Sequence, residues 1–299
     1  MMKPPGRTPF PRFAYLGTPA SPRPTAGELG RRELLRRLAL GLAALPVARA
    51  LAACTDAGDD TAAGPDAGGT DGTIGGSAWA SGGTAAMTDK ASYPDPFTAA
   101  LTSCAVVTAT TEGPCTTATD LAREDVSEGW SGLPVRLILK VVDAACQPVV
   151  GATVKIWHTN KAGVYSGQTP NPGMCSNNDA AVIAQDFFRG VQTTDADGVV
   201  GFDTCFPGWY RGRAVHVHFQ VKTASTSYKI SQLFFPEDVT AAIFASHGEY
   251  ASYGQPDTRF ASDTIVSGIG AAKLSQHVFT VARMTDGAML ASKVVAVTG

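Results

Sequence analysis

The sequence lacks the excess of basic residues that a nucleic-acid-binding surface requires. Its 299 residues include 24 Lys and Arg against 26 Asp and Glu, which gives a formal net charge of -2. Such a chain has no positive field to attract phosphates, so no nucleic-acid partner is expected. Charged residues are only 17% of the chain, whereas hydrophobic residues reach 44%, which suits one globular domain with accessory segments or two small domains.

Metal and redox sites built on closely spaced cysteines are also missing. No Cys-x-x-Cys pair occurs, so neither a zinc ribbon nor a thioredoxin-like site is indicated. The acidic residues before Gly198 lack the twelve-residue ligand spacing of an EF-hand. Of the 6 cysteines, five lie after Cys54, between residues 104 and 205. In an oxidising compartment these five predict up to two disulfides and one free thiol.

The N-terminal segment has the features of an export signal rather than of a membrane span. Arg31 and Arg32 precede a short apolar run at 38–47, and Leu-Ala-Ala-Cys54 follows it. The paired arginines resemble a bacterial twin-arginine signal, and the last four residues resemble a lipobox in which Cys54 would be lipidated. We predict that residues 1–54 export the protein to the cell surface, with Cys54 as its one membrane anchor; an ordinary cleaved signal with an incidental cysteine is the alternative.

The next segment, residues 55–92, is rich in Gly, Ala, Asp, Ser and Thr and has hardly any large apolar residues. Such a composition buries too little surface to offset the entropy of ordering the chain. We predict a flexible linker here, followed by a folded domain over residues 93–299.

Apolar residues with period two predict strands in this domain. Val135, Leu137, Leu139 and Val141 alternate with polar residues, and residues 152–156 repeat the pattern, as expected for half-buried antiparallel strands. The Asp195-Ala196-Asp197-Gly198 turn predicts a β-hairpin between flanking strands. The fold class is therefore all-β, an antiparallel β-sandwich with long loops and few short helices. Further strands are expected at 214–222, 229–235 and 277–284, and short helices at 95–103 and 236–245.

Two histidines stand out as candidate metal ligands. His216 and His218 are separated by one residue, so in a strand both imidazoles project from the same face, while Val217 and Phe219 point to the other face. Two histidines on a solvated strand face are the plain alternative. A Pro-Gly-Trp-Tyr turn ending at Tyr210 leads into this strand and brings aromatic residues close to it.

Several motifs in the correct order resemble the intradiol ring-cleavage dioxygenases, the non-haem iron(III) enzymes that include protocatechuate 3,4-dioxygenase and catechol 1,2-dioxygenase. The similarity runs from Cys104 to about Phe244, and the exported, cysteine-bearing form looks most like the secreted branch. The motifs are Thr111-Glu112-Gly113-Pro114, Arg123-Glu124-Asp125-Val126, the segment 151–165 ending Ala-Gly-Val-Tyr, Arg189-Gly190-Val191-Gln192-Thr193, and Pro-Gly-Trp-Tyr followed by Arg213-x-x-His216-x-His218.

This resemblance implies an iron(III) ion held by two tyrosines and two histidines. The ligand positions map onto Tyr165, Tyr210, His216 and His218. Phenolates are hard anionic donors and favour iron(III) over iron(II). The implied reaction opens a catechol-type ring between its two hydroxylated carbons with O2 and gives a muconate-type diacid. Tyr210 would leave the iron on substrate binding and act as a base.

The resemblance also assigns catalytic roles to Arg213 and Gln232. Arg213 would stabilise negative charge on the substrate ring, and Gln232 would support the site from behind the ligands. A surface salt-bridging arginine and an edge-strand glutamine are the alternatives. Ala214 stands where the family often has proline. The other three histidines match no ligand position and are predicted to be structural: His158, His247 and His277.

Two other functions compete with a dioxygenase. One is a non-catalytic exported β-sandwich that binds a partner on the same scaffold, and the other is a copper or zinc protein that uses His216 and His218 alone. The presence of Tyr165 and Tyr210 at the family's spacings favours catalysis. For the disulfides we predict a Cys175–Cys205 pair, which would tie together the segments that carry the two tyrosines. The second pair is drawn from Cys104, Cys115 and Cys146.

Overall fold

The computed structural model describes residues 78–223 and 228–298. The predicted signal segment, with Arg31, Arg32 and Cys54, lies outside the described residues, as does most of the predicted linker. Within the described part of the chain, no helix is long and apolar enough to cross a bilayer.

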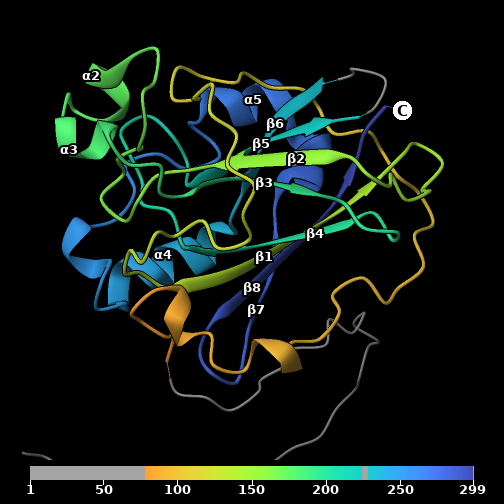
Figure 1. The fold of residues 1–299 in the computed structure, drawn as a ribbon, viewed down its shortest axis with the longest axis horizontal. Helices are drawn as coiled ribbons and strands as arrows, with labels where there is room; N and C mark the ends of the chain where they lie inside the picture. Colours follow the sequence, from red (N-terminus) through yellow and green to blue (C-terminus); the bar gives the residue numbers. More distant parts are fainter. Residues whose placement is uncertain (1–77, 224–227, 299) are drawn as a thin grey trace, which may run out of the picture. The chain divides into compact units, whose positions relative to one another are not determined.

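In the described residues, eight strands form two four-stranded sheets (Figure 1). One sheet has the order β4-β1-β8-β7 and the other β3-β2-β5-β6. The two sheets and few short helices agree with the predicted all-β sandwich. The strands are β1 (Pro134–Val142), β2 (Thr153–Trp157), β3 (Arg189–Thr193), β4 (Val199–Cys205), β5 (His216–Lys222), β6 (Tyr228–Phe234), β7 (Thr280–Arg283) and β8 (Met289–Ala296).

The main core lies between the two sheets. Leu137 and Leu139 of β1 share one hydrophobic cluster with Val217 and Phe219 of β5, and all four are fully or almost fully buried. Because strand side chains alternate, this places His216 and His218 on the outer face of the second sheet. The predicted orientation of the β5 side chains is therefore confirmed.

The last strand, β8, was not expected from the sequence. It pairs in parallel with β1, with Val135 opposite Met289, so the sandwich is not purely antiparallel as predicted. Residues Met289 to Ser292 are buried on successive positions, without the polar alternation of a half-buried strand. A strand covered on both faces has no period-two pattern, which is why the periodicity missed it.

The predicted hairpin at 195–198 is wrong in its pairing. The turn itself forms, because Asp195 N–H donates to Val199 O at 2.9 Å and Gly198 N–H donates to Asp195 O at 3.1 Å. However, β3 pairs with β2 and β4 pairs with β1, so the turn carries the chain from one sheet to the other. Turn chemistry fixes the local bend, whereas the strands choose their partners from the rest of the fold.

Helices are few and short in the part of the chain that the structure describes. The longest, α4 (Glu237–Ser246), confirms the helix predicted at 236–245, and α5 (Thr264–Ile269) and α6 (Ala271–Leu274) follow it. The predicted helix at 95–103 does not form; instead Phe97 N–H donates to the side chain of Asp95 in a turn between prolines. The remaining short helices are η1 (Thr84–Ala86), η2 (Lys90–Ser92), α2 (Pro172–Cys175), α3 (Ala180–Ile183), η3 (Ala251–Tyr253) and η4 (Ser275–His277).

The end of the predicted linker packs on the sandwich. Trp79 packs against the main core, and Lys90 forms a 2.6 Å ion pair with Asp203 of β4. Tyr93 donates a hydrogen bond of 2.8 Å to Asp286. The folded unit therefore begins before residue 93, because one tryptophan and a few polar contacts hold a segment that is otherwise made of small residues.

The predicted Cys175–Cys205 disulfide is wrong. The disulfides are Cys115–Cys175 and Cys104–Cys146, of which the second is drawn from the three cysteines expected to supply a pair. Cys205 is a buried free thiol. It packs with Phe187 and Phe188, whereas Cys175 lies in a separate cluster, so the two cysteines face different parts of the interior.

Candidate metal centre

Strand β5 places both histidines on the outer face of its sheet, beside two neighbouring strands. His218 lies opposite Trp157 of β2 and opposite Gln232 of β6. The rings of Trp157 and His218 stack with centroids 4.9 Å apart and an interplanar angle of 11°. The sheet therefore supplies an aromatic neighbour on one side of His218 and an amide on the other.

Two loops bring the tyrosines to this face, and two glycines let the loops touch. Gly163 has φ 78°, and a Cβ there would clash with the carbonyl of Trp209. A Cβ on Gly208 would clash with the carbonyl oxygens of the 160–161 turn. The Ala-Gly-Val-Tyr and Pro-Gly-Trp-Tyr motifs thus need glycine so that the backbones before Tyr165 and Tyr210 can approach each other.

The four predicted ligands meet at one point. The Oη atoms of Tyr165 and Tyr210 each lie 3.3 Å from His216 Nε2. His218 Nε2 lies 3.2 Å from the same atom. The prediction that these four side chains converge is confirmed; their role as metal ligands remains a prediction.

Hydrogen bonding fixes the tautomer of His216. Its Nδ1 lies 2.6 Å from the carbonyl oxygen of Ala214, which can only accept, so the ring proton is on Nδ1 and the Nε2 lone pair faces the cluster. A single lone pair cannot serve the three polar atoms around it. By contrast, Nδ1 of His218 is buried without a hydrogen-bond partner, so packing against Trp157 orients that ring. These oxygen and nitrogen atoms meet without enough hydrogen-bond partners among themselves, and a bound cation would satisfy their lone pairs.

Burial keeps the four groups uncharged. It lowers the pKa of His216 to about 3, with a further contribution from the positive charge of Arg213, and it lowers the pKa of His218 well below the ordinary value. Burial also raises the pKa of Tyr165 well above its ordinary value and raises that of Tyr210. Neutral imidazoles are the form that binds metals, and two phenols become anionic donors when a cation replaces their protons.

The donor set fits iron(III). Over residues 78–223 and 228–298, no group of three or more His, Cys, Asp or Glu side chains is placed to hold a metal ion, so a site here depends on the tyrosines. Two phenolates provide hard donors with two negative charges beside two neutral imidazoles, which suits a trivalent ion better than zinc or copper(I). Tyr165 is 2% exposed, whereas Tyr210 is partly exposed, so Tyr210 is the more accessible of the two phenols.

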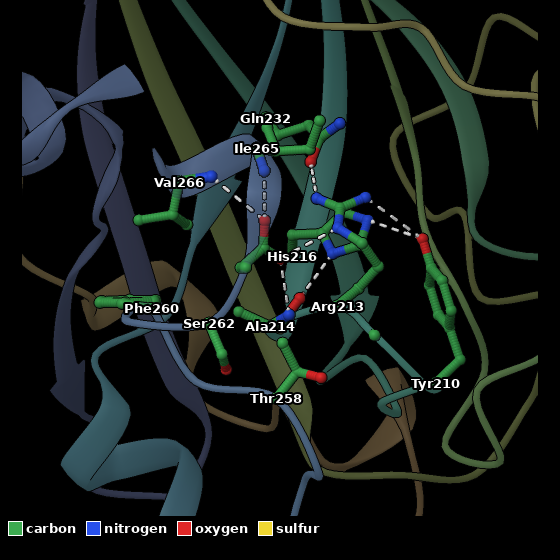
Figure 2. Close-up of polar contacts among 12 residues, drawn as sticks. Tyr210, Arg213, Ala214, His216, Gln232, Thr258, Phe260, Ser262, Ile265 and Val266 are labelled. Carbon is green, nitrogen blue, oxygen red and sulfur yellow. Dashed lines mark hydrogen bonds and ion pairs between the residues drawn. The ribbon is translucent and has the colours of Figure 1, made fainter. Parts of the chain in front are cut away.

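Arg213 and Gln232 are in contact beside the cluster (Figure 2). Arg213 Nη2 donates to Gln232 Oε1, and Arg213 Nη1 lies 3.5 Å from Tyr210 Oη. Gln232 Nε2 donates in turn to Thr111 O at 3.2 Å. The structure therefore places Arg213 next to Tyr210 and Gln232 next to Arg213, and their catalytic roles remain predictions.

Two charged residues at the site were given no role by the sequence. Asp263 is fully buried and lies 2.9 Å from Arg213 Nε. Arg189 is 2% exposed, donates to the backbone oxygens of Ser166 and Cys115, and lies 6.0 Å from the centroid of the Tyr165 ring. Burial lowers the pKa of Arg189 to about 10. Asp263 precedes a short apolar helix, which is an N-cap signal, and Arg189 lies in a family motif, but neither signal shows what the charge contacts.

The other three histidines lie away from the cluster, as predicted. His158 bonds Thr159 O at 2.8 Å and Thr204 Oγ1 at 2.7 Å, and it is buried against Phe188. His277 accepts from Thr108 N–H at 3.2 Å. His247 lies 2.9 Å from Ala80 O. Each therefore joins segments of the fold that are distant in sequence.

Comparisons with known proteins found a matching family model and similar solved structures. Residues 110–247 match the family model described as Dioxygenase. An intradiol ring-cleavage dioxygenase from Tetranychus urticae matches with 25% identity and a TM-score of 0.58, over 65% of this chain and 95% of that one. A search of curated proteins gave no match.

Two further solved structures are more distant. Hydroxyquinol 1,2-dioxygenase from Pseudomonas putida DLL-E4 has 17% identity and a TM-score of 0.46, over 64% of this chain and 66% of that one. Catechol 1,2-dioxygenase from Pseudomonas arvilla C-1 has 20% identity and a TM-score of 0.45, over 64% and 62%. With the matched segment and the Tetranychus urticae structure, the resemblance of this chain to the intradiol ring-cleavage dioxygenases is confirmed.

Proposed function

We propose that the protein is an iron(III) intradiol dioxygenase that opens catechol-type rings between the two hydroxylated carbons. Both atoms of O2 enter the product, so a catechol and one O2 become a muconate-type diacid with no other co-reactant. The convergence of Tyr165 Oη, Tyr210 Oη and His218 Nε2 within 3.3 Å of His216 Nε2 carries this proposal. A binding module would have no use for one buried and one partly exposed phenol aimed at a pair of neutral imidazoles.

The roles of the protein's own residues follow from their burial and contacts. Bound iron(III) supplies a Lewis-acidic centre that favours the catechol dianion. Tyr210, the more exposed of the two side chains, would be a phenolate once iron has displaced its proton, and this phenolate would accept a proton from a catechol hydroxyl, whereas the buried Tyr165 stays in place. The Arg213 guanidinium, 3.5 Å from Tyr210 Oη, faces the place that the substrate oxygens would occupy and stabilises negative charge there.

Metal content, colour and oxygen uptake test the proposal together. The purified protein loaded with iron should be red-brown from tyrosinate-to-iron(III) charge transfer, and it should consume O2 with at least one member of a catechol panel. Ultraviolet spectra should show a muconate-type product. A colourless protein that retains only zinc or copper, or a coloured protein that consumes no O2 with any catechol, would contradict the proposal.

Three variants assign the roles within the site. Tyr210→Phe should keep much of the iron and lose turnover, because it removes a base and an anionic ligand. His218→Ala should lower iron occupancy itself, because it removes a ligand nitrogen. Arg213→Ala should keep iron and colour while slowing turnover on the order of a hundredfold. Tyr253→Phe, which changes an exposed tyrosine, is the matched control and should behave like the wild type.

We also propose that the protein is exported and anchored at the cell surface through a lipidated Cys54. The two disulfides support an oxidising compartment. When the protein is expressed in a bacterium, the wild type should partition with membranes and Cys54→Ala should not. Recovery of both proteins in the cytoplasmic fraction would contradict export, and recovery of both in the membrane fraction would contradict the anchor.

A further inference from the structure

Asp263 lies beside Arg213 but comes from a distant part of the chain. It precedes α5 and falls outside residues 110–247, the segment that matches the family model. Its side chain is completely buried, and its Oδ2 atom lies 2.9 Å from Arg213 Nε. The same oxygen accepts the Ala214 N–H at 2.8 Å. One carboxylate oxygen therefore holds both the side chain of Arg213 and the backbone of the next residue.

The other carboxylate oxygen is held by the start of α5. Asp263 Oδ1 accepts the N–H groups of Ile265 at 2.7 Å and Val266 at 3.1 Å. The helix itself is fixed, because Val266 and Ile269 pack in one buried cluster with Phe234 of β6. With four hydrogen bonds and no exposure to water, the Asp263 carboxylate has one orientation.

This carboxylate determines where the guanidinium of Arg213 points. An arginine side chain has many rotamers, and a contact at Nε fixes the plane of the whole guanidinium group. Arg213 Nε donates to Asp263. On the other side of the guanidinium, Nη2 donates to Gln232 and Nη1 faces Tyr210 Oη (Figure 2). The arginine thus joins a carboxylate on one side to the amide and the phenol of the candidate site on the other.

We infer that Asp263 is a positioning residue: it holds Arg213 so that the guanidinium charge faces the catechol oxygens bound next to Tyr210. The inference rests on the proposed dioxygenase function for its kinetic consequence, but its structural part concerns Arg213 alone. A residue with this role acts only through Arg213, whereas a residue that merely caps α5 acts through the stability of the fold.

Two substitutions of Asp263 separate these roles. Asp263→Asn replaces one acceptor with an amide that cannot pair with the arginine as a charge. Asp263→Ser keeps a good N-cap for α5 but is too short to reach Arg213 and carries no charge. Asp179→Asn is the matched control, because Asp179 caps α3 by accepting the Ala181 N–H at 2.9 Å and contacts no arginine in the part of the chain described.

Turnover should fall about ten- to a hundredfold in both Asp263 variants, mainly in kcat, because a displacement of about 1 Å near the reacting atoms is enough for such a loss. Iron content and colour should match the wild type, and the Asp179 control should retain full kcat. In an Arg213→Ala background, a further change of Asp263 to Ser should have no additional effect on kcat. Full kcat in Asp263→Ser, or an equal loss of kcat with and without Arg213, would overturn the inference.

A second measurement uses the metal-free protein and needs no activity. The Arg213 Nε–H, buried against a carboxylate, should give a slowly exchanging, downfield-shifted signal in 1H–15N NMR spectra. That signal should move to the exposed-arginine region in both Asp263 variants and remain in Asp179→Asn. An unchanged signal overturns the positioning role even if the dioxygenase proposal holds. If instead the wild type proves inactive, the NMR result still decides whether Asp263 orients Arg213.

Discussion

The two disulfides can be removed one at a time. We expect either removal to lower the stability by a similar amount, but only one of them to lower metal retention. Cys115–Cys175 closes a sequence separation of 60 residues and Cys104–Cys146 one of 42. From loop-closure entropy, each should stabilise the protein by about 4 kcal/mol, and the two should differ by only about 0.3 kcal/mol. They are therefore matched in their effect on the unfolded chain.

Their positions in the folded protein differ. Cys175 O accepts the Tyr165 N–H at 2.8 Å, and the disulfide packs in the same cluster as Trp157 and Tyr165. Cys115 anchors the segment that begins at Thr111 and lies over His218, since a Cβ on Gly113 would be 3.5 Å from His218 Cε1. The Cys104–Cys146 pair makes none of these contacts. Only one disulfide therefore holds the candidate metal centre.

We expect Cys115→Ala/Cys175→Ala and Cys104→Ala/Cys146→Ala to lose similar free energies of unfolding in urea, measured on the metal-free proteins. Iron retention against a chelator should fall about 10- to 100-fold in the first pair only, as for other changes that loosen the supports of metal ligands. Equal iron retention in both variants, with the stability losses as stated, would refute the argument that this disulfide fixes Tyr165.

Two further predictions concern the fold around the site. Gly208→Ala should destabilise the protein by about 3 kcal/mol, because its Cβ meets backbone that cannot move aside, whereas Gly248→Ala, with nothing within 4 Å, should change the urea midpoint little. Burial lowers the pKa of His158 to about 4, below its ordinary value of about 6.5. Between these two pH values the unfolded state binds a proton at this histidine and the native state does not. The free energy of unfolding should therefore fall by about 3 kcal/mol as the pH drops from 6.5 to 4. His158→Gln should remove that part of the pH dependence. The check is the free energy of unfolding in urea at pH 7 and at pH 4.5. If the difference between the two pH values is the same in His158→Gln as in the wild type, another group is responsible.

The sequence by itself determined the features that depend on neighbouring residues. Alternation along β1 and β5 was enough to orient their side chains, and it placed His216 and His218 on one face because a strand repeats every two residues. The order of the motifs identified Tyr165 and Tyr210 as their partners, and the structure brings all four together. Gly163 and Gly208 could be seen in the sequence as part of those motifs. The sequence did not show why glycine is needed there, which is the close approach of two backbone segments.

Only the tertiary structure decided which distant segments meet. β8 is buried on both faces, so its sequence has no period-two alternation of apolar and polar residues. Neither the strand nor its parallel pairing with β1 could therefore be predicted from periodicity. The turn at 195–198 was correctly placed, but turn residues do not specify which sheet each strand joins. The disulfide partners of Cys115 and Cys175 likewise depend on how two loops pack, which spacing alone does not fix. Asp263 reaches Arg213 across 50 residues because α5 packs on β6, and a contact of this kind is set by the fold as a whole.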